Sequence, residues 1–537
     1  MDSKTALADN KVKIMDFKSI ERRINEYTHE EKVRLEIEPP RHWVDNNPQE
    51  FTREQRATTT ILIGGLTLSQ DKLIEAGFES IGYRVKALDC PTHESLQYGK
   101  EYGNRGQCNP VYFTVGNLIR HLVYLRDNAG QSTEQIIREN IFLTAGGCGP
   151  CRFGMYITEY RKALRDAGFE GFRVVTFKHD KGINQGPAEA GLALTPRFFI
   201  TLVSAIVAGD VLNAVGYRMR PYETEKGATD KALKTCRELL ATSLRRRKNM
   251  LLSLYRCRKI LHSVRLNRLQ IKPRVSITGE FWAMTTEGEG NYHLQKYLES
   301  EGAECMVQPV TDRVLHNLWE AEFNNSRVLT LRKHNKTDHI TRDFTPVKHL
   351  FLIRLAKVIL ASSFRAYAWA IGLKNYPVTN FNKMAMFGKN YYTLENQGGE
   401  AHLECAHLVE MAKENTAHLM ISVKPFGCMP SSAVSDGIQA KILEDYPDAN
   451  FLAIETTGDS PVLFYSRIQM ALYKAKKRAD TEVRLLLQKH SCSSQSAMNM
   501  LASNSKVNDY RYYPTAQAAG TTARLYEHLL RESFLER

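Results

Sequence analysis

The chain has 537 residues, of which 43% are hydrophobic, and a formal net charge of +14 at pH 7. This length allows roughly three or four domains of about 150 residues and a sizeable buried core. We expect a soluble, cytoplasmic protein, because no apolar run approaches the ~18 residues of a membrane span and no signal peptide is visible. The ten cysteines do not have the regular spacing of a disulfide-rich domain, which favours a role in metal binding or redox chemistry over structural disulfide bonds.

In chain order, the sequence begins with a polar stretch and then alternates strand and helix patterns. Residues 1–57 lack a strand–turn–helix rhythm and predict an N-terminal arm. Residues 58–189 predict a first α/β lobe, because buried strands such as Ile61–Ile63 alternate with helical patterns. Residues 190–271 carry long apolar periodicity with few strand signals, which predicts a helical basic region.

The second half of the chain returns to the α/β alternation. Residues 272–390 predict a second α/β lobe with helices, and residues 391–490 predict a third α/β region whose first strand runs directly into Cys428. Residues 491–537 are rich in Ser, Asn and Thr and predict a loosely ordered tail with at most one helix. The predicted fold class is therefore α/β, with several parallel-sheet lobes and a helical connecting region.

The positive charge is concentrated in one segment. Residues 232–274 hold thirteen Lys or Arg, including Arg245–Lys248, against a single acid, Glu238. Because the rest of the chain is nearly neutral, we interpret this segment as a solvated or partner-facing helical face. An acidic protein or a phosphate-bearing ligand is the next alternative, and nucleic acid is the least favoured.

A Cys-Gly-Pro-Cys sequence provides the first chemical candidates. Cys148 and Cys151 follow an apolar strand-like run and a glycine pair, and they precede a helical pattern over residues 153–167. The N-terminus of a helix favours thiolate over thiol, and Arg152 acts in the same direction. The pair therefore suits either redox exchange or metal binding.

Two further cysteines lie on loops of similar construction. Cys108 lies in a Gly- and Asn-rich loop, and Cys428 lies in a turn directly after a strand. In open α/β sheets ligands collect at such strand ends, so the four cysteines could converge on one site. Four thiolates are typical of an iron–sulfur cluster or a zinc site, although their spacing is too dispersed for a zinc ribbon or finger. A redox dithiol and no site at all are the remaining alternatives.

The dithiol alternative rests on the thioredoxin-like Cys-Gly-Pro-Cys sequence. Thioredoxins, however, place this motif near the start of a small domain, whereas here a long stretch of α/β chain precedes it and no Trp precedes Cys148. A glycine turn over residues 398–402 could also place Glu400 or His402 near the same edge, with capping and packing as the alternative. No Walker A sequence occurs, so we expect no ATP hydrolysis through a P-loop.

Five long, collinear stretches carry a family resemblance. The chain resembles the 2-hydroxyacyl-CoA dehydratase D-component family, in particular its branch of CoA-substrate-specific enzyme activase-related proteins. The resemblance covers about residues 60–480 and is carried by these stretches: GKEYGNRGQCNPVYFTVGNLIRHL, GGCGPCRFGMYITEYRKALRDAGFEGFRV, VAGDVLNAVGYRMRPYE, GEFWAMTTEGEGNYHLQKYLESEGAE and VKPFGCMPSSAVSDGIQAKI.

The resemblance implies an oxygen-sensitive iron–sulfur protein with Rossmann-like or flavodoxin-like lobes. Some relatives carry a double-cubane cluster. Carried over by motif, the expected ligands of the cluster are Cys108, Cys148, Cys151 and Cys428. Four ligands suffice for one [4Fe-4S] cluster, whereas a double cubane needs about six thiolates, for which Cys90 and Cys405 are weak further candidates. A single [4Fe-4S] cluster is therefore the expected cofactor.

The resemblance also implies a partner and a reaction. The chain shows no phosphate motif of the actin-like sugar kinase superfamily, so a separate iron–sulfur ATPase of that superfamily is the expected activator. A dehydratase needs a cluster iron open to the substrate, and four cysteines on one cubane leave none open. We therefore expect a low-potential reductase or electron-transfer component that acts on an acyl-CoA or another small molecule. We expect no membrane or nucleic-acid partner, and the chain could form an oligomer.

Two alternatives from other classes stand beside this prediction. One is a thioredoxin-like dithiol oxidoreductase that uses Cys148 and Cys151. The other is a non-catalytic scaffold whose basic helix docks a partner.

Overall fold

The chain divides into two units, residues 1–46 and 47–537. In the first unit the structure describes one helix, α1 (Phe17–Arg34). The predicted N-terminal arm over residues 1–57 is therefore too long, because Phe51 is fully buried in the core of the second unit. The structure is a computed structural model that describes residues 17–35, 50–147, 151–178, 182–183, 190–334, 345–395, 399–459, 461–502 and 504–535.

A five-stranded sheet forms the first lobe of the second unit. Its strand order is β2-β1-β3-β4-β5; the first four strands in this order run parallel, and the two-residue β5 pairs antiparallel at the edge. The strands are β1 (Thr60–Ile63), β2 (Arg84–Ala87), β3 (Asn140–Ala145), β4 (Arg173–Lys178) and β5 (Gly182–Ile183). The helices are α2 (Leu68–Ser80), α3 (His93–Tyr102), α4 (Asn109–Asp127), α5 (Thr133–Glu139) and α6 (Tyr156–Asp166).

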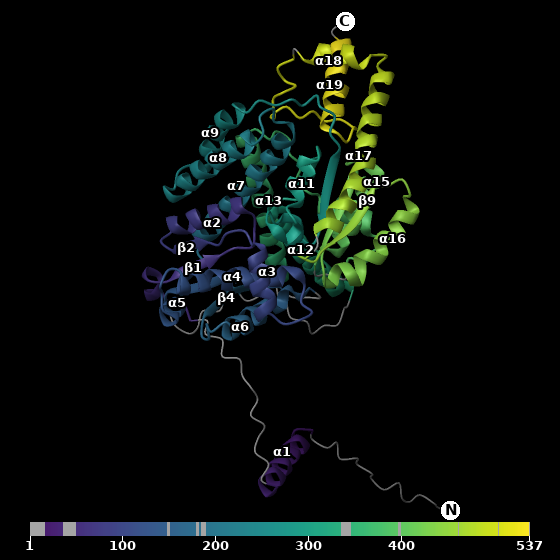
Figure 1. The fold of residues 1–537 in the computed structure, drawn as a ribbon. Helices are drawn as coiled ribbons and strands as arrows, with labels where there is room; N and C mark the ends of the chain where they lie inside the picture. Colours follow the sequence, from purple (N-terminus) through teal and green to yellow (C-terminus); the bar gives the residue numbers. More distant parts are fainter. Residues whose placement is uncertain are drawn as a thin grey trace, which may run out of the picture. The chain divides into compact units, whose positions relative to one another are not determined.

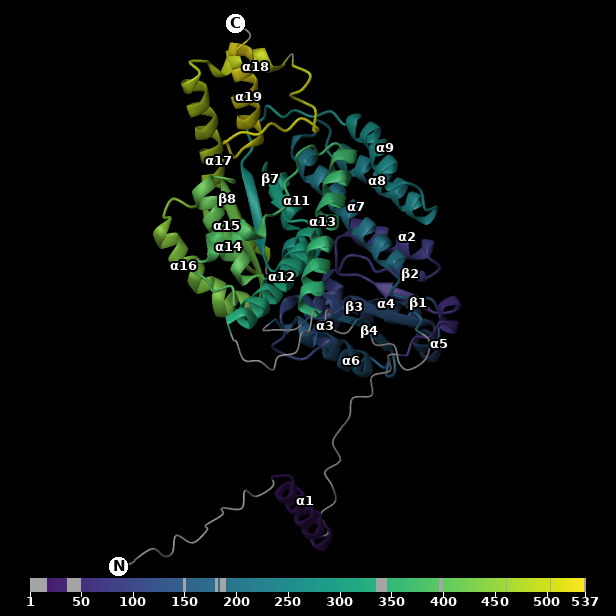
Figure 2. The same ribbon diagram turned by 180° about the vertical axis from the view of Figure 1, so that it is seen from behind.

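A second sheet, of four parallel strands, forms the other lobe (Figures 1 and 2). Its strand order is β7-β6-β8-β9. The strands are β6 (Arg274–Gly279), β7 (Glu304–Val307), β8 (Leu419–Pro425) and β9 (Phe451–Thr456). The helices between these strands are α10 (Phe281–Thr285), α11 (Leu294–Ser300), α12 (Val310–His334), α13 (Thr345–Ile371), α14 (Phe381–Gly388), α15 (Ala401–Glu414) and α16 (Asp436–Asp445).

This sheet corrects the predicted division between residues 272–390 and 391–490. Strands from both regions belong to one sheet, because β6 pairs with β8 in a register that sets Ile277 against Ile421. The long helices α12 and α13 lie between β7 and β8 in the chain, and their length makes one lobe look like two in the sequence. The predicted α/β class with parallel-sheet lobes is confirmed.

Both lobes use the same strand order. In each sheet the chain runs from the first strand outward to the second and then crosses back to place the third strand on the other side of the first. This is the flavodoxin-like order, in which ligands bind at the carboxyl ends of the first and third strands. In the two lobes these strands are β1 with β3, and β6 with β8.

The central strands are apolar because helices cover both faces of a parallel sheet. All seven residues of β8 are buried, including Lys424, whose ammonium group contacts Asp436 and donates to Gln439 Oε1 at 2.8 Å. Gly279 ends β6 with φ +126°, and a Cβ there would overlap the backbone of Val423. This close approach of backbones sets the position of Glu280, the next residue.

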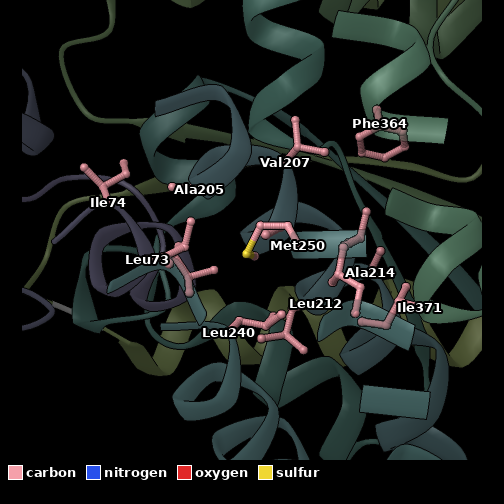
Figure 3. Close-up of a cluster of buried hydrophobic side chains, with 14 of the residues drawn as sticks. Leu73, Ile74, Ala205, Val207, Leu212, Ala214, Leu240, Met250, Phe364 and Ile371 are labelled. Carbon is pink, nitrogen blue, oxygen red and sulfur yellow. The ribbon is translucent and has the colours of Figure 1, made fainter. Parts of the chain in front are cut away.

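A helical layer joins the two lobes, as predicted for residues 190–271. Its helices are α7 (Pro196–Met219), α8 (Ala228–Arg245) and α9 (Met250–His262). Helix α7 contacts α2 of the first lobe and β7 of the second. Figure 3 shows the resulting core, where Leu73, Leu212 and Leu240 meet from three helices.

Helix α7 corrects the expectation that no apolar run is long enough to span a membrane. Residues 196–222 meet the length and composition of a membrane span, and 56% of their most apolar window is buried inside the protein. The core helix of a soluble protein meets the same criterion. Here α7 packs against α2, α8 and α13.

Part of the basic segment forms contacts inside the molecule. Arg245 pairs with Glu79 at 2.5 Å, and Arg247 donates to the carbonyl of Ser80 at 2.8 Å. Arg258 donates to the carbonyl of Ala370 at 2.6 Å. These contacts fasten α8 and α9 to α2 and α13, so part of the positive charge serves the fold.

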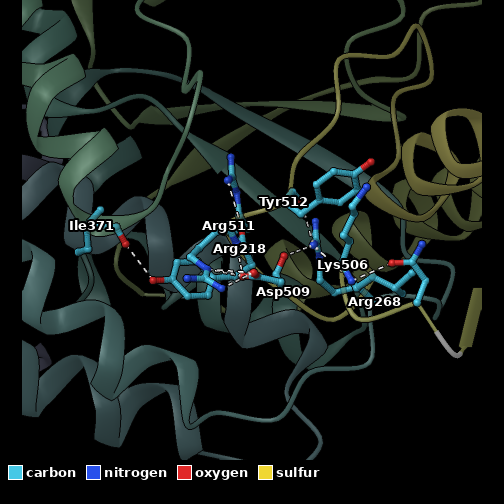
Figure 4. A network of polar contacts seen from close by, with 10 residues as sticks. Arg218, Arg268, Ile371, Lys506, Asp509, Arg511 and Tyr512 are labelled. Atoms are coloured by element: carbon cyan, nitrogen blue, oxygen red, sulfur yellow. Dashed lines mark hydrogen bonds and ion pairs between the residues drawn. The ribbon is translucent and has the colours of Figure 1, made fainter. Parts of the chain in front are cut away.

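The C-terminal tail is not loosely ordered as predicted. Helices α17 (Pro461–Lys489), α18 (Ser494–Ala502) and α19 (Thr521–Leu535) share an apolar core of their own. The loop before α19 is held by Arg268, which is fully buried and donates to the carbonyls of Asp509 at 2.6 Å and Tyr512 at 2.9 Å (Figure 4). The composition of residues 491–537 suggests disorder. The segment is ordered because its carbonyl groups accept hydrogen bonds from the buried guanidinium of Arg268.

Candidate functional site

The two lobes place cysteines after equivalent strands. Cys151 follows β3 in the first lobe, and Cys428 follows β8 in the second. Each of these strands lies beside the first strand of its sheet, at the point where the strand order reverses. This is the position at which open α/β sheets bind ligands.

The loops of Cys108 and Cys428 are in contact. Cys108 caps the start of α4, and the backbone N–H of the next residue, Asn109, donates to the carbonyl of Phe426 at 3.1 Å. Gly427 has φ +78°, and a Cβ there would lie 3.4 Å from Cys108 Cα. Both cysteines are 6% exposed. The structure thus brings together two of the predicted site residues that are far apart in the sequence.

The loop of Cys151 joins the same region. Arg152, the next residue, donates to the carbonyl of Gly106 at 2.6 Å and so ties this loop to that of Cys108. Tyr156, one turn further on, places its hydroxyl 3.1 Å from Cys108 Sγ. Cys148 lies outside the described residues, so its predicted place in the site stays a prediction.

A buried carboxylate shapes the loop that leads to Cys108. Glu159 on α6 accepts hydrogen bonds from Asn104 Nδ2 at 2.8 Å and from Gln107 Nε2 at 2.9 Å. Lys162, on the same helix, donates to the carbonyl of Tyr102 at 2.7 Å. Helix α6 therefore fixes the conformation of residues 102–107, the loop that leads to Cys108.

Glu280 is the acid that the three described thiols share. Burial is the main cause that raises the pKa of all three thiols, Cys108, Cys151 and Cys428, and the pKa of Cys151 reaches about 12. The negative charge of Glu280 raises each of these pKa values further. A Coulomb interaction weakens with distance, so Glu280 lies near each of them. Its own side chain caps α10 by accepting from the N–H of Ala283 at 2.8 Å.

A second acid, Glu400, lies close by. Burial, together with the charge of Glu400, raises the pKa of Glu280 to about 7, and Glu400 also raises the pKa of Cys151. Arg313 pairs with Glu400 at 2.8 Å. From the sequence alone, the glycine turn indicates Glu400, whereas Glu280 has no predicted role; its place directly after the first strand of the second lobe is the signal that could have found it.

The expectation that Cys151 is a thiolate is not met, although the backbone N–H of Phe153 at the start of the helical segment does lower its pKa as predicted. The segment after Cys151 is a short 3₁₀ turn (Arg152–Met155), which carries little of the dipole of a full helix. Burial and the charges of Glu400 and Glu280 outweigh the Phe153 N–H and raise the pKa of Cys151 to about 12. A thiolate at this place needs a bound cation to compensate it, as metal ligation provides.

A cavity of about 420 Å³ opens beside the contact between Cys108 and Cys428. On the side of the first lobe, the cavity is lined by several residues between 100 and 112, including Lys100 and Arg105. On the side of the second lobe, it is lined by Phe426, Thr457 and Asp459. Lys100 pairs with Asp459 across the two lobes at 2.6 Å. The cavity has the volume of a small-molecule site and is lined by Arg105 beside the Lys100–Asp459 ion pair.

The two weaker cysteine candidates have other neighbours. Cys90 is half-buried, and burial with the charges of Glu287 and Asp71 raises its pKa to about 12. Cys405 lies on α15 and is fully buried among apolar side chains. Neither is placed against the Cys108 loop by a contact that the structure describes.

A separate group of potential metal ligands lies on α12 and α15. Among the described residues, His316, Glu320 and His402 place their ligand atoms within 4.8 Å of one another. Burial is the main cause that lowers the pKa of His316 to about 2 and of His402 to about 4, so both imidazoles are neutral at pH 7. Sequence reasoning noted His402 but missed His316, which a His-x-x-x-Glu spacing on one helix could have revealed.

Fold and site together define an α/β protein of two flavodoxin-like lobes with thiols and acids gathered where the lobes meet. No family model and no curated protein matches this chain.

Proposed function

We propose that the chain is an iron–sulfur protein that holds one [4Fe-4S] cluster between its two lobes. The proposed ligands are Cys108, Cys148, Cys151 and Cys428. The observation that carries the proposal is the meeting of the Cys108 and Cys428 loops, through the bond from Asn109 N to the Phe426 carbonyl, with the Cys151 loop tied to them by Arg152.

The spacing of the described thiols is compatible with a cluster. Among the described residues, no three cysteine sulfurs lie within the 4.8 Å that one metal ion requires. The thiolates of a cubane bind different irons and therefore lie farther apart than the ligands of one ion. Burial and the nearby acids oppose uncompensated thiolates, which favours a positively charged cluster core at this place.

The proposed activity is that of a low-potential reductase or electron-transfer component related to 2-hydroxyacyl-CoA dehydratases. A bound cluster would supply single electrons at low potential. The cavity beside Cys108 and Phe426 would hold the small-molecule acceptor, with Arg105 to attract an anionic group. A separate iron–sulfur ATPase of the actin-like superfamily would supply the electrons, in the cytoplasm.

The two alternatives receive less support from the geometry. A dithiol enzyme needs a reactive thiolate, and burial raises the pKa of Cys151 to about 12. A scaffold would dock a partner through the basic segment, and three of its thirteen cations, Arg245, Arg247 and Arg258, are already bonded within the chain.

The test is the iron and acid-labile sulfide content of the chain purified without oxygen. We expect about four of each per chain, and loss of the chromophore in Cys108→Ser and in Cys428→Ser. Cys492→Ser, in the C-terminal region, is the matched control and should keep the wild-type content. About eight irons would instead indicate a double cubane with more ligands, and an iron-free chain with reversible dithiol chemistry would refute the proposal.

A further inference from the structure

We propose that His316, Glu320 and His402 form a binding site for one divalent transition-metal ion, best suited to Zn²⁺. The site is distinct from the cysteines and does not depend on the proposed cluster. His316 and Glu320 lie one turn apart on α12, and His402 lies on α15. Ligand atoms of all three lie within 4.8 Å of one another.

The spacing of the ligand atoms fits a single tetrahedral ion. His316 Nε2 lies 3.1 Å from His402 Nε2 and 3.8 Å from Glu320 Oε1. Two Zn–N bonds of ~2.0–2.1 Å at a tetrahedral angle place the two nitrogens about 3.3 Å apart. The two nitrogens therefore already stand almost at the separation that a shared Zn²⁺ would impose.

The surroundings hold the ligands in place. His316 is fully buried and His402 nearly so, whereas the Glu320 side chain is 17% exposed and gives the ion a route from solvent. Rings of Phe381 and Tyr392 pack around the two imidazoles, with centroids 5.3 Å from His316 and 6.1 Å from His402 respectively. Apolar walls exclude water and strengthen ligation by the few polar atoms inside.

The local charge balance also favours a cation. Arg313, one turn before His316 on the same helix, is the nearest positive group that would repel the ion, and Glu400 pairs with it at 2.8 Å. Glu320 then provides the negative charge that binds a divalent cation. Two neutral imidazoles and one carboxylate are the ligand set of many zinc sites that keep a fourth position for water.

The alternative to a metal ion is a simple hydrogen bond between the two Nε2 atoms. Two neutral imidazoles that face each other through Nε2 share one proton. His316 Nδ1 is buried without a hydrogen-bond partner in the described part of the chain. This atom stays unpaired whether Nε2 binds a proton or a metal ion, so the case for the ion rests on the spacing of the three ligand atoms. A metal ion would use the lone pairs of both Nε2 atoms.

Zinc binding to the full chain tests the site. The purified protein is stripped with a chelator, titrated with Zn²⁺, and examined for zinc content and for zinc-edge X-ray absorption. Nitrogen and oxygen ligands lie at about 2.0–2.1 Å from zinc and thiolates at about 2.3 Å, so the spectrum separates this site from zinc bound to the cysteines. The variants are Glu320→Gln and His402→Gln.

The matched control is Glu322→Gln, on the same helix but bonded to Arg354 at 2.8 Å instead of facing the histidines. We expect one Zn²⁺ per chain with a nitrogen and oxygen shell in the wild type and the control, and at least about tenfold weaker binding in Glu320→Gln. Equal affinity in Glu320→Gln and Glu322→Gln, or a shell of sulfur alone, would overturn the proposal. If His402→Gln fails to fold, the near-isosteric Glu320→Gln still decides.

Discussion

At the scale of single residues, Gly427 controls how closely the two cysteine loops approach. Its φ of +78° lies in the left-handed region, and a Cβ would stand 3.3 Å from the carbonyl oxygen of Gln107. A side chain therefore costs backbone strain and also pushes the Cys428 turn away from Cys108. The second cost is specific to the site.

Gly427→Ala should consequently lower the iron content by more than half while the chain stays folded. Gly130→Ala is the matched control, because Gly130 also has positive φ (+69°) but has open space around its Cβ position. Both variants should lose about 1–2 kcal/mol of stability from backbone strain alone. Equal iron retention in the two variants would show that the contact between the loops does not shape the site.

Glu280 makes the stability of the cluster-free chain depend on pH. Burial and the charge of Glu400 raise its pKa to about 7 in the folded protein, against a reference value of 4.5. A raised carboxyl pKa means that the folded state prefers the protonated acid. Its favourable contribution is therefore complete below about pH 4.5 and is lost as the pH rises through 7.

Glu280→Gln should stabilise the cluster-free chain at pH 8 by about 2 kcal/mol relative to wild type, with little effect near pH 4.5. Glutamine keeps an oxygen that can cap α10 through Ala283 N. Thermal unfolding across pH 4.5–8 measures the difference, with Glu170→Gln on the surface as control. A constant difference between Glu280→Gln and wild type at every pH would contradict the assigned burial of the charge.

At the scale of elements, the C-terminal segment depends on one guanidinium from the helical region. Arg268 donates to the carbonyls of Asp509 and Tyr512, and Tyr510 donates to the carbonyl of Ile371 at 2.8 Å. These bonds fix the loop that leads into α19. Without them, buried carbonyls would lose their partners.

Arg268→Met should cost about 3 kcal/mol, since it leaves buried carbonyls unpaired. Tyr510→Phe removes one bond and should cost about 1 kcal/mol. Hydrogen exchange measured by mass spectrometry should show faster exchange over residues 504–535 in Arg268→Met, with the β-sheets unchanged. Arg531→Met, at an exposed site on α19, serves as control; unaltered exchange in Arg268→Met would mean that the segment is held by its apolar core alone.

At the scale of the whole molecule, the site belongs to residues 47–537. Both lobes, the helical layer and the C-terminal helices lie in this unit, and residues 1–46 form a unit of their own. The lobes share one apolar core through α7, α8 and α13. Cluster binding between the lobes should therefore require the whole second unit and none of the first.

A chain that lacks residues 1–46 should keep its iron content and unfold within about 2 °C of the full chain, because none of the core residues that the structure describes lies in this unit. A chain that ends at residue 490 is the contrasting variant. It loses α18 and α19 with their apolar core, and it should aggregate or unfold at lower temperature. Loss of iron on removal of residues 1–46 would assign the first unit a part in the site.

The sequence by itself determined the local elements and the chemical candidates. Apolar strand patterns ending in glycine, as at Gly279, and the cysteines after them were visible because strand period and turn residues are local properties. From these alone, parallel sheets and the cysteine loops at their ends could be predicted. The family resemblance then supplied the expectation of a cluster.

Only the tertiary structure decided which segments meet. The pairing of β6 with β8 across the inserted helices, and the contact of Gly427 with Cys108, depend on close approaches between residues far apart in the chain. The electrostatic role of Glu280, the facing histidines of α12 and α15, and the order of the C-terminal segment depend on burial in the same way. Burial and contact are properties of the packed core, and no local pattern encodes them.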